Sequence, residues 1–192
     1  MERNAPSREE ALELLRKYNK NENLIRHGLA VEGVMRHFAA LYNEDADKWG
    51  IIGLVHDIDY GMFPEQHCIK ARELLAESNW PEEYIRAVQS HGWGICSDVE
   101  PLSVMEKVLY TVDELTGLIV AAALVRPNKS IMEVEVKSIK KKWNQKAFAA
   151  GVDRATIERG AEMLGLDLDR VIEETIAGMQ KVAGEIGLKG TA

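Results

Sequence analysis

The chain has 192 residues, nearly half of them hydrophobic, so it can bury a sizeable core without disulfide bonds. Its formal net charge is −7 and its pI is about 5.3. This acidic balance argues against a nucleic-acid partner, because binding to a phosphate backbone needs lysine and arginine clustered on one face.

The N-terminus, the apolar runs and the cysteines give no sign of a secreted or membrane protein. Residues 1–10 are polar and charged, unlike the basic start and apolar run of a signal peptide. The longest apolar stretch, 118–125, is far too short to span a bilayer. Cys68 and Cys96 are the only cysteines, and their separation does not match a CxxC metal motif. We therefore predict a soluble cytoplasmic protein with reduced thiols and no membrane partner.

Apolar residues recur at helical spacing through most of the chain. Ser7 and Glu10 have the spacing of a capping box, in which each side chain satisfies a free backbone N–H, so a helix is expected after Ser7. Gly61 and Pro64 interrupt the pattern and predict a loop. Further helices are expected at about 22–41, 45–57, 66–77, 81–90 and 102–125, with a loop over 92–101.

The last third of the chain contains two or three further predicted helices. Asp153 and Asp167 are candidate N-caps, and Gly165 is a candidate stop between them. The run 131–136 is the only β-like stretch, and we interpret it as helix or connector. Because no strand pattern of useful length occurs, the sequence predicts an all-α helical bundle.

A histidine–aspartate pair, His56–Asp57, directly follows the apolar residues Leu54 and Val55. A charge placed after a run of buried type is costly unless it is compensated, and such conflicts tend to mark functional sites. A metal ion would compensate the aspartate and use the imidazole lone pair. The other candidate ligands lie on successive predicted helices, as in metal sites of helical bundles. They are His27, His67, His91 and Asp113.

In these residues the sequence resembles the HD-domain superfamily, whose members are mostly metal-dependent phosphohydrolases. The family pattern is a histidine, a His-Asp pair and a distant aspartate, matched by His27, His56–Asp57 and Asp113. His67 and His91 stand where the dinuclear members have two more histidines. The segments 56–67 and 86–91 look like a small uncharacterised branch of predicted HD hydrolases. The resemblance implies one HD-type helical domain over 1–192, with a motif core at about 20–125 and a helical extension at about 126–192.

The same resemblance implies two divalent metal ions. The first would be held by His27, His56, Asp57 and Asp113. His67 and His91 would bind the second, with the Asp57 carboxylate bridging the two ions. This mixed donor set suits Mn, Fe, Co, Ni or Zn better than Mg. The expected catalytic residues are Asp57, His56 and Asp59, although Asp59 could equally be a partner of a ligand or a residue of the helix-terminal turn.

Other polar residues are given structural interpretations. His37 fits no position in the pattern, and we read it as structural or solvent-facing. Glu106 shares a helix face with Asp113, so it either orients a ligand or forms an ion pair. Glu114 is read as solvated or as a neighbour of a ligand. The basic run 140–142 is read as a solvated helix face.

The leading functional prediction is a phosphohydrolase that acts, through a metal-activated hydroxide, on a small phosphorylated molecule such as a nucleotide-like phosphoester. Two alternatives stay open. One is a mixed-valent di-iron oxygenase, because myo-inositol oxygenase and the phosphonate-cleaving oxygenases resemble HD proteins with six ligands. The other is a non-catalytic, ligand-binding HD domain. An exposed apolar face on a C-terminal helix could also form a homodimer.

Overall fold

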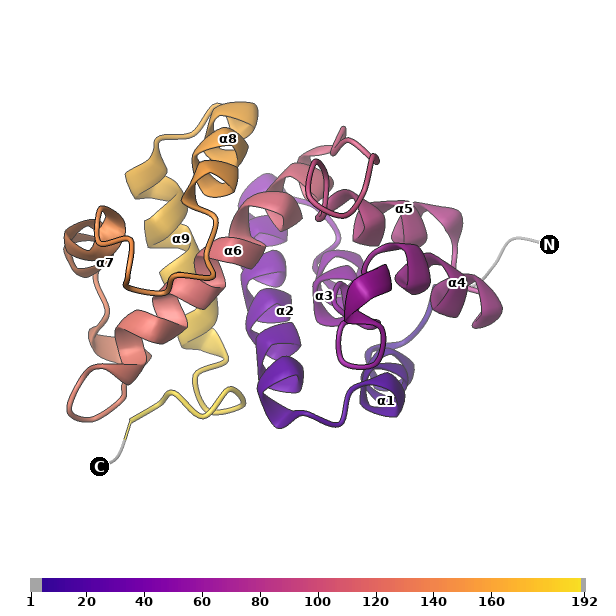
Figure 1. The fold of residues 1–192 in the computed structure, drawn as a ribbon, viewed down its shortest axis with the longest axis horizontal. Coiled ribbons are helices and arrows are strands. Elements are labelled where there is room, and N and C mark those ends of the chain that lie inside the picture. Colours follow the sequence, from indigo (N-terminus) through magenta and orange to yellow (C-terminus); the bar gives the residue numbers. More distant parts are fainter. Residues whose placement is uncertain (1–4, 191–192) are drawn as a thin grey trace.

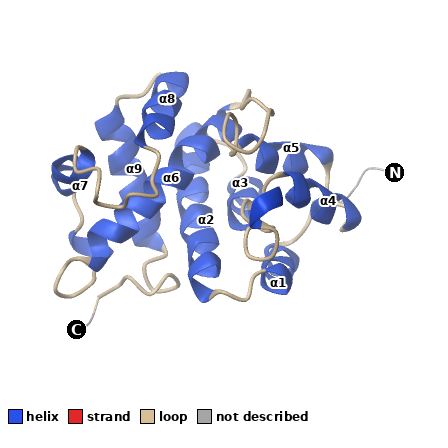
Figure 2. Ribbon diagram, viewed as in Figure 1, coloured by secondary structure: helices blue, strands red, loops and turns tan. Residues whose placement is uncertain are grey.

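A computed structural model describes residues 5–190, and within that range the chain folds into nine α-helices and no β-strand, which confirms the all-α prediction (Figures 1 and 2). Two short 3-10 turns, Pro64–Gln66 and Ile131–Glu133, lie between helices. The helices are α1 (Arg8–Tyr18), α2 (Glu22–Tyr42), α3 (Ala46–Val55), α4 (Ile69–Glu77), α5 (Glu82–Ser90), α6 (Val104–Leu124), α7 (Val136–Trp143), α8 (Arg154–Leu164) and α9 (Leu168–Lys181).

Several helix ends follow directly from capping residues. At α1 the predicted capping box is present: the Glu10 N–H donates to the Ser7 hydroxyl, and the Ser7 N–H donates to the Glu10 carboxylate. Asp153 accepts the N–H of Ala155 at the start of α8, and Gly165 ends that helix at φ 65°. A left-handed residue without a Cβ is the common helix stop, so these two boundaries were readable from the sequence.

The helix expected at 66–77 begins later, at Ile69. Pro64–Gln66 forms a 3-10 turn, and Cys68 has a φ of 66°, which a right-handed helix cannot include. His67 therefore lies in an irregular segment before α4. The β-like run 131–136 becomes a 3-10 turn and the first residue of α7.

Helices α2 and α6 occupy the middle of the molecule (Figure 1). α3 packs most extensively on α2, and α1, α4 and α5 lie on that side. On the other side α9 packs on α2, and α7 and α8 pack on α6. The C-terminal extension thus covers the same two helices as the motif core, which supports our proposal of a single domain. None of the described helices has the length and apolar character needed to cross a membrane.

Two glycines allow α2 and α3 to approach closely beside the candidate site. A methyl group at Gly28 would lie 2.6 Å from the carbonyl oxygen of Leu54, and one at Gly53 would lie 3.1 Å from that of Val31. Backbone atoms cannot move aside as a flexible side chain can. Because Gly28 follows His27, this close crossing fixes where that histidine lies relative to the end of α3.

We therefore expect Gly28→Ala to lower the free energy of unfolding by about 1–3 kcal/mol, because the methyl group overpacks the α2–α3 contact. Urea denaturation measures the change. Gly184→Ala is the matched control, since nothing lies within 4 Å of the added methyl group. The control should change stability by less than about 1 kcal/mol. Equal stability of the two variants would contradict the close crossing.

Candidate metal centre

His27, His56 and Asp113 meet at one point although they come from three helices. His27 lies in α2, His56 follows the last residue of α3, and Asp113 lies near the middle of α6. Nε2 of His27 is 3.1 Å from Nε2 of His56 and 2.9 Å from Oδ1 of Asp113. Nε2 of His56 is 3.1 Å from the same oxygen. Three atoms able to bind a metal thus face one another.

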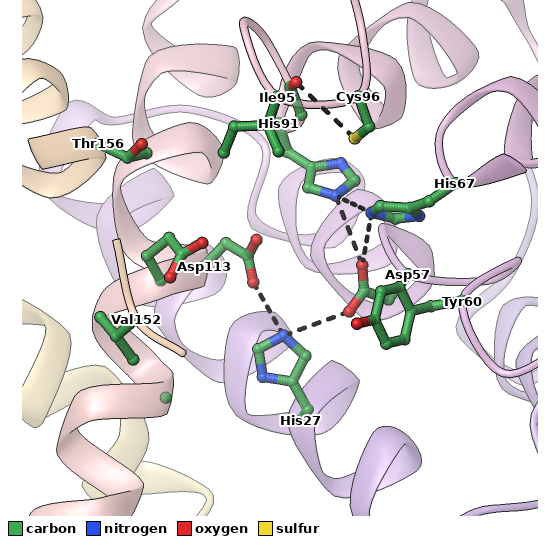
Figure 3. Close-up of a pocket in the computed structure, with 13 residues that line it drawn as sticks. His27, Asp57, Tyr60, His67, His91, Ile95, Cys96, Asp113, Val152 and Thr156 are labelled. Carbon is green, nitrogen blue, oxygen red and sulfur yellow. Dashed lines mark hydrogen bonds and ion pairs between the residues drawn. The ribbon is translucent and has the colours of Figure 1, made fainter. Parts of the chain in front are cut away.

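A second pair of imidazoles, His67 and His91, has the same arrangement, with their Nε2 atoms 3.1 Å apart. His67 precedes α4 and His91 follows the last residue of α5. Figure 3 shows both rings turned toward Asp57. The segment before α4 and the C-terminal end of α5, which both follow the Gly61–Pro64 loop in the sequence, therefore supply this pair.

The Asp57 carboxylate lies between the two histidine pairs. Its Oδ2 is 3.6 Å from Nε2 of His27 and 3.5 Å from Nε2 of His56. Its Oδ1 is 3.3 Å from Nε2 of His67 and 3.5 Å from Nε2 of His91. Each carboxylate oxygen thus faces one pair, and the dashed lines in Figure 3 trace three of these four contacts.

Backbone carbonyls set the tautomer of two of these rings. Nδ1 of His56 donates to the carbonyl of Gly53 at 2.8 Å, and Nδ1 of His91 donates to that of Val88 at 2.5 Å. A neutral imidazole that donates from Nδ1 carries its lone pair on Nε2. The Nε2 lone pairs of His56 and His91 then face the other ring of each pair, an arrangement that suits a shared cation.

Asp59 contacts His67 from the side away from the pocket. Its Oδ1 accepts the Nδ1–H of His67 at 2.7 Å, and its Oδ2 accepts the N–H of Ala71 at 2.8 Å. Asp59 is fully buried and does not line the pocket. Of the roles considered for Asp59, this geometry matches a partner that orients a histidine and increases its basicity.

The electrostatics of the cluster favour a cation. Burial alone would raise the pKa of Asp57 and Asp113, but electrostatic attraction to His56 and hydrogen bonds from neighbouring histidines hold both well below the usual range. Burial alone would lower the pKa of His91, but the hydrogen bond to Asp57 and the charge of Asp113 raise it to about 9. The pKa of His27 is raised in the same way, by Asp113. Without metal the cluster therefore retains protons between its donor atoms.

The cluster opens into a pocket of about 370 Å³ (Figure 3). Its wall beyond the cluster includes Tyr60, Ile95, Glu114, Val152 and Thr156. Burial, followed by the charge of Asp113, raises the pKa of Glu114 to about 7, and this carboxylate also accepts the N–H of Asp153. Val152 and Thr156 come from the C-terminal extension, far outside the motif core. Sequence periodicity gave no signal for them, because only the packing of α8 on α6 brings them to the pocket.

His37 and Glu106, two polar residues considered in the sequence analysis, make their contacts away from the histidine–aspartate cluster. His37 joins α2 to α9: its Nε2 lies 2.5 Å from Glu174, and Lys181 donates to its Nδ1. Glu106 accepts from Arg86 at 2.7 Å and completes a capping box at the start of α6. Both contacts match the structural interpretations given above.

Within residues 5–190, three groups of side chains bring one donor atom each to within 4.8 Å of one another, close enough to hold a metal ion. They are His27, His56 and Asp57; His56, His91 and Asp113; and His67, Cys68 and His91. Imidazole and carboxylate donors in these combinations suit divalent transition metals. The molecule is thus a helical protein whose buried histidines and aspartates could hold metal.

A comparison with known protein families agrees with a helical protein that could hold metal. Residues 24–128 match the model of the HD domain, and the chain belongs to this family. The match spans α2 to α6 and contains all six candidate ligands. HD domains bind divalent metals and are generally metal-dependent hydrolases. No solved structure matches the chain.

Proposed function

We propose that this HD protein is a phosphohydrolase with two divalent metal ions, and that its substrate is a small phosphorylated molecule such as a nucleotide-like phosphoester. The observation that carries the proposal is the placement of Asp57, whose two oxygens face two separate histidine pairs at 3.3–3.6 Å. A carboxylate so placed suits a bridge between two ions. The pocket of about 370 Å³ suits a small substrate.

In this proposal His27, His56, Asp57 and Asp113 would hold one ion. His67 and His91 would hold the other, and Asp57 would contribute to both. When bound, such ions lower the pKa of water toward neutrality and stabilise charge on phosphoryl oxygens. The protein's own part is to fix the donors: Asp59 orients His67, and the carbonyls of Gly53 and Val88 orient His56 and His91. The side chains named here are buried or half-buried.

Arg159 is our candidate for contact with the substrate's phosphate oxygens. The described residues that line the pocket include three carboxylates and no lysine or arginine. Arg159 follows Thr156 of the pocket wall by one helical turn, and its guanidinium lies 5.9 Å from the centre of the Trp93 ring. Nη1 also donates to the hydroxyl of Tyr110 at 3.3 Å. No carboxylate of residues 5–190 pairs with it, so its charge is available to an anion.

Replacing this arginine should weaken substrate binding more than turnover. We expect Arg159→Ala to raise KM about 10-fold, because a hydrogen bond to a charged group contributes about 1.5–3 kcal/mol. Arg159→Lys should restore part of the loss, since it keeps the charge but not the planar fork. The control is Arg16→Ala, which removes an exposed arginine of α1. Unchanged steady-state kinetics for Arg159→Ala would exclude this contact.

The function is tested by elemental analysis of protein purified without added metal, followed by phosphate release from a panel of nucleotides and sugar phosphates. We expect about two Mn, Co, Ni or Zn ions per chain and release of phosphate. His67→Ala should lose one of the two ions, while His37→Gln, which lies outside the cluster, should keep both. About two iron atoms with substrate-dependent oxygen uptake would instead establish the oxygenase alternative. Tight ligand binding without turnover under any metal would establish a binding domain.

The hydrogen bond from His67 to Asp59 gives a further prediction. We expect Asp59→Asn to weaken binding of one ion about 10- to 100-fold and to leave the other in place, because loss of an orienting partner typically has this effect. Competition with a chromogenic chelator measures both affinities. Loss of neither ion would mean that His67 needs no such partner.

A further inference from the structure

The two cysteines, 28 residues apart in the sequence, meet beside the second histidine pair. Sγ of Cys68 lies 2.9 Å from Sγ of Cys96. Cys68 directly follows His67, and Cys96 belongs to the loop that follows His91. Both sulfur atoms lie against Gly92, where any side chain would be too close to them. The thiols therefore share a space that the glycine leaves open.

The two thiols differ in their access to small molecules. Cys68 is buried, whereas Cys96 is partly exposed. Cys96 lines the pocket of the candidate metal centre, and both cysteines line a neighbouring cavity of about 480 Å³. An accessible thiol with a buried thiol in reach is the arrangement of an oxidation-sensitive pair, in which the second sulfur resolves the oxidised first one.

We propose that Cys68 and Cys96 are a reversible oxidation site that forms a disulfide with hydrogen peroxide as the oxidant. Sγ of Cys96 attacks one peroxide oxygen, the O–O bond breaks, and a sulfenic acid and one water form. Sγ of Cys68 then attacks the Cys96 sulfur, the S–O bond breaks, and the hydroxyl leaves with the Cys68 proton as a second water. Two thiols are oxidised and one peroxide is reduced to two waters. A dithiol reverses the reaction by exchange.

The disulfide should disturb the histidine pair, a consequence that rests on the proposed function. Bonding shortens the sulfur–sulfur distance from 2.9 Å to about 2.05 Å. The N–H groups of Ile95, Cys96 and Ser97 all donate to the carbonyl of Gly92, so the loop moves together with the residue after His91. Metal–ligand distances in proteins normally lie within about 0.2 Å of their standard values, so a shift of His91 would weaken its bond to an ion. Oxidation is therefore expected to release the ion held by His67 and His91.

The test treats the metal-loaded protein with a small excess of hydrogen peroxide and analyses its tryptic peptides by mass spectrometry. The expected product links the peptides 49–70 and 87–107, with loss of two hydrogen atoms that dithiothreitol reverses. Cys96→Ser and Cys68→Ser are the matched controls and should give no such link. Separate oxidation of the two cysteines without a cross-link would overturn the proposal.

Metal content distinguishes this inference from the proposed function. Bound metal should fall by about half on oxidation and return with dithiothreitol and added metal. Cys96→Ser, which lies outside the three groups that could hold a metal, should lose no metal under the same treatment. A cross-linked protein with unchanged metal would overturn the coupling to the histidine pair. If the proposed function is wrong, the protein with both thiols reduced will not contain two metal ions. The mass-spectrometric test of the cross-link does not depend on that result.

Discussion

Asp57→Asn is expected to remove most of the bound metal and to lower hydrolysis about 1,000-fold or more, because both the charge and the bridging donor are lost. Asparagine has nearly the same shape but no negative charge. The four imidazole Nε2 atoms within 3.6 Å of this carboxylate would lose the group that compensates the cations between them. Elemental analysis and phosphate release, measured on the same preparation, give the two effects together.

Asp45→Asn is the matched control for that experiment. Asp45 caps α3 by accepting the N–H groups of Asp47 and Lys48, and asparagine is an equally good N-cap. The same chemical change there should leave metal content and activity near those of the unmodified protein. If Asp57→Asn retained two ions per chain, the carboxylate could not be their bridge. If it retained one, the residue would belong to one histidine pair alone.

The candidate ligand residues could be predicted because each lies within a predicted helix or next to the end of one. His56 and Asp57 follow an apolar helix, so their polarity conflicts with the pattern around them. His27 and Asp113 were found from their positions on other predicted helices and from the resemblance to HD domains. Helical periodicity predicted the helices themselves, and capping residues predicted several of their ends. Periodicity could not give the irregular segment at His67, because the left-handed backbone of Cys68 depends on packing rather than on any turn-forming residue type.

Features that depend on contacts distant in sequence were beyond prediction. The partnership of Asp59 with His67 needs the loop between them to fold back, and the same local sequence also suits a simple turn. The contact of Cys68 with Cys96 depends on how α4 and the loop after α5 meet. Thr156 reaches the pocket only because Gly160 lets α8 pack against Thr111 of α6. For Asp59 the sequence left a role beside a ligand and a turn residue equally open, and for the cysteines and Thr156 it gave no functional signal.

Removal of the metal ions should lower the stability of the protein, and the loss should grow as the pH rises from about 6.5 to about 9. In the metal-free protein the pKa of His91 is raised from 6.5 to about 9. A group whose folded pKa is raised contributes stability that is fully present below its unfolded pKa and disappears as the pH passes its folded pKa. Protons therefore compensate Asp57 and Asp113 at pH 6.5 but no longer do so above pH 9.

The metal-loaded protein should lack this dependence, because metal ions take the place of the protons on Nε2. A pKa change from 6.5 to about 9 corresponds to a stability difference on the order of 3 kcal/mol, or roughly 10 °C in Tm for a chain of this size. Thermal unfolding with and without a chelator at pH 6.5 and pH 9 measures it. His91→Gln should reduce the pH dependence, since glutamine does not titrate, and His27, whose pKa is also raised, should account for part of what is left. A chelator effect of equal size at both pH values would mean that protons and metal ions do not compete for the same nitrogen atoms.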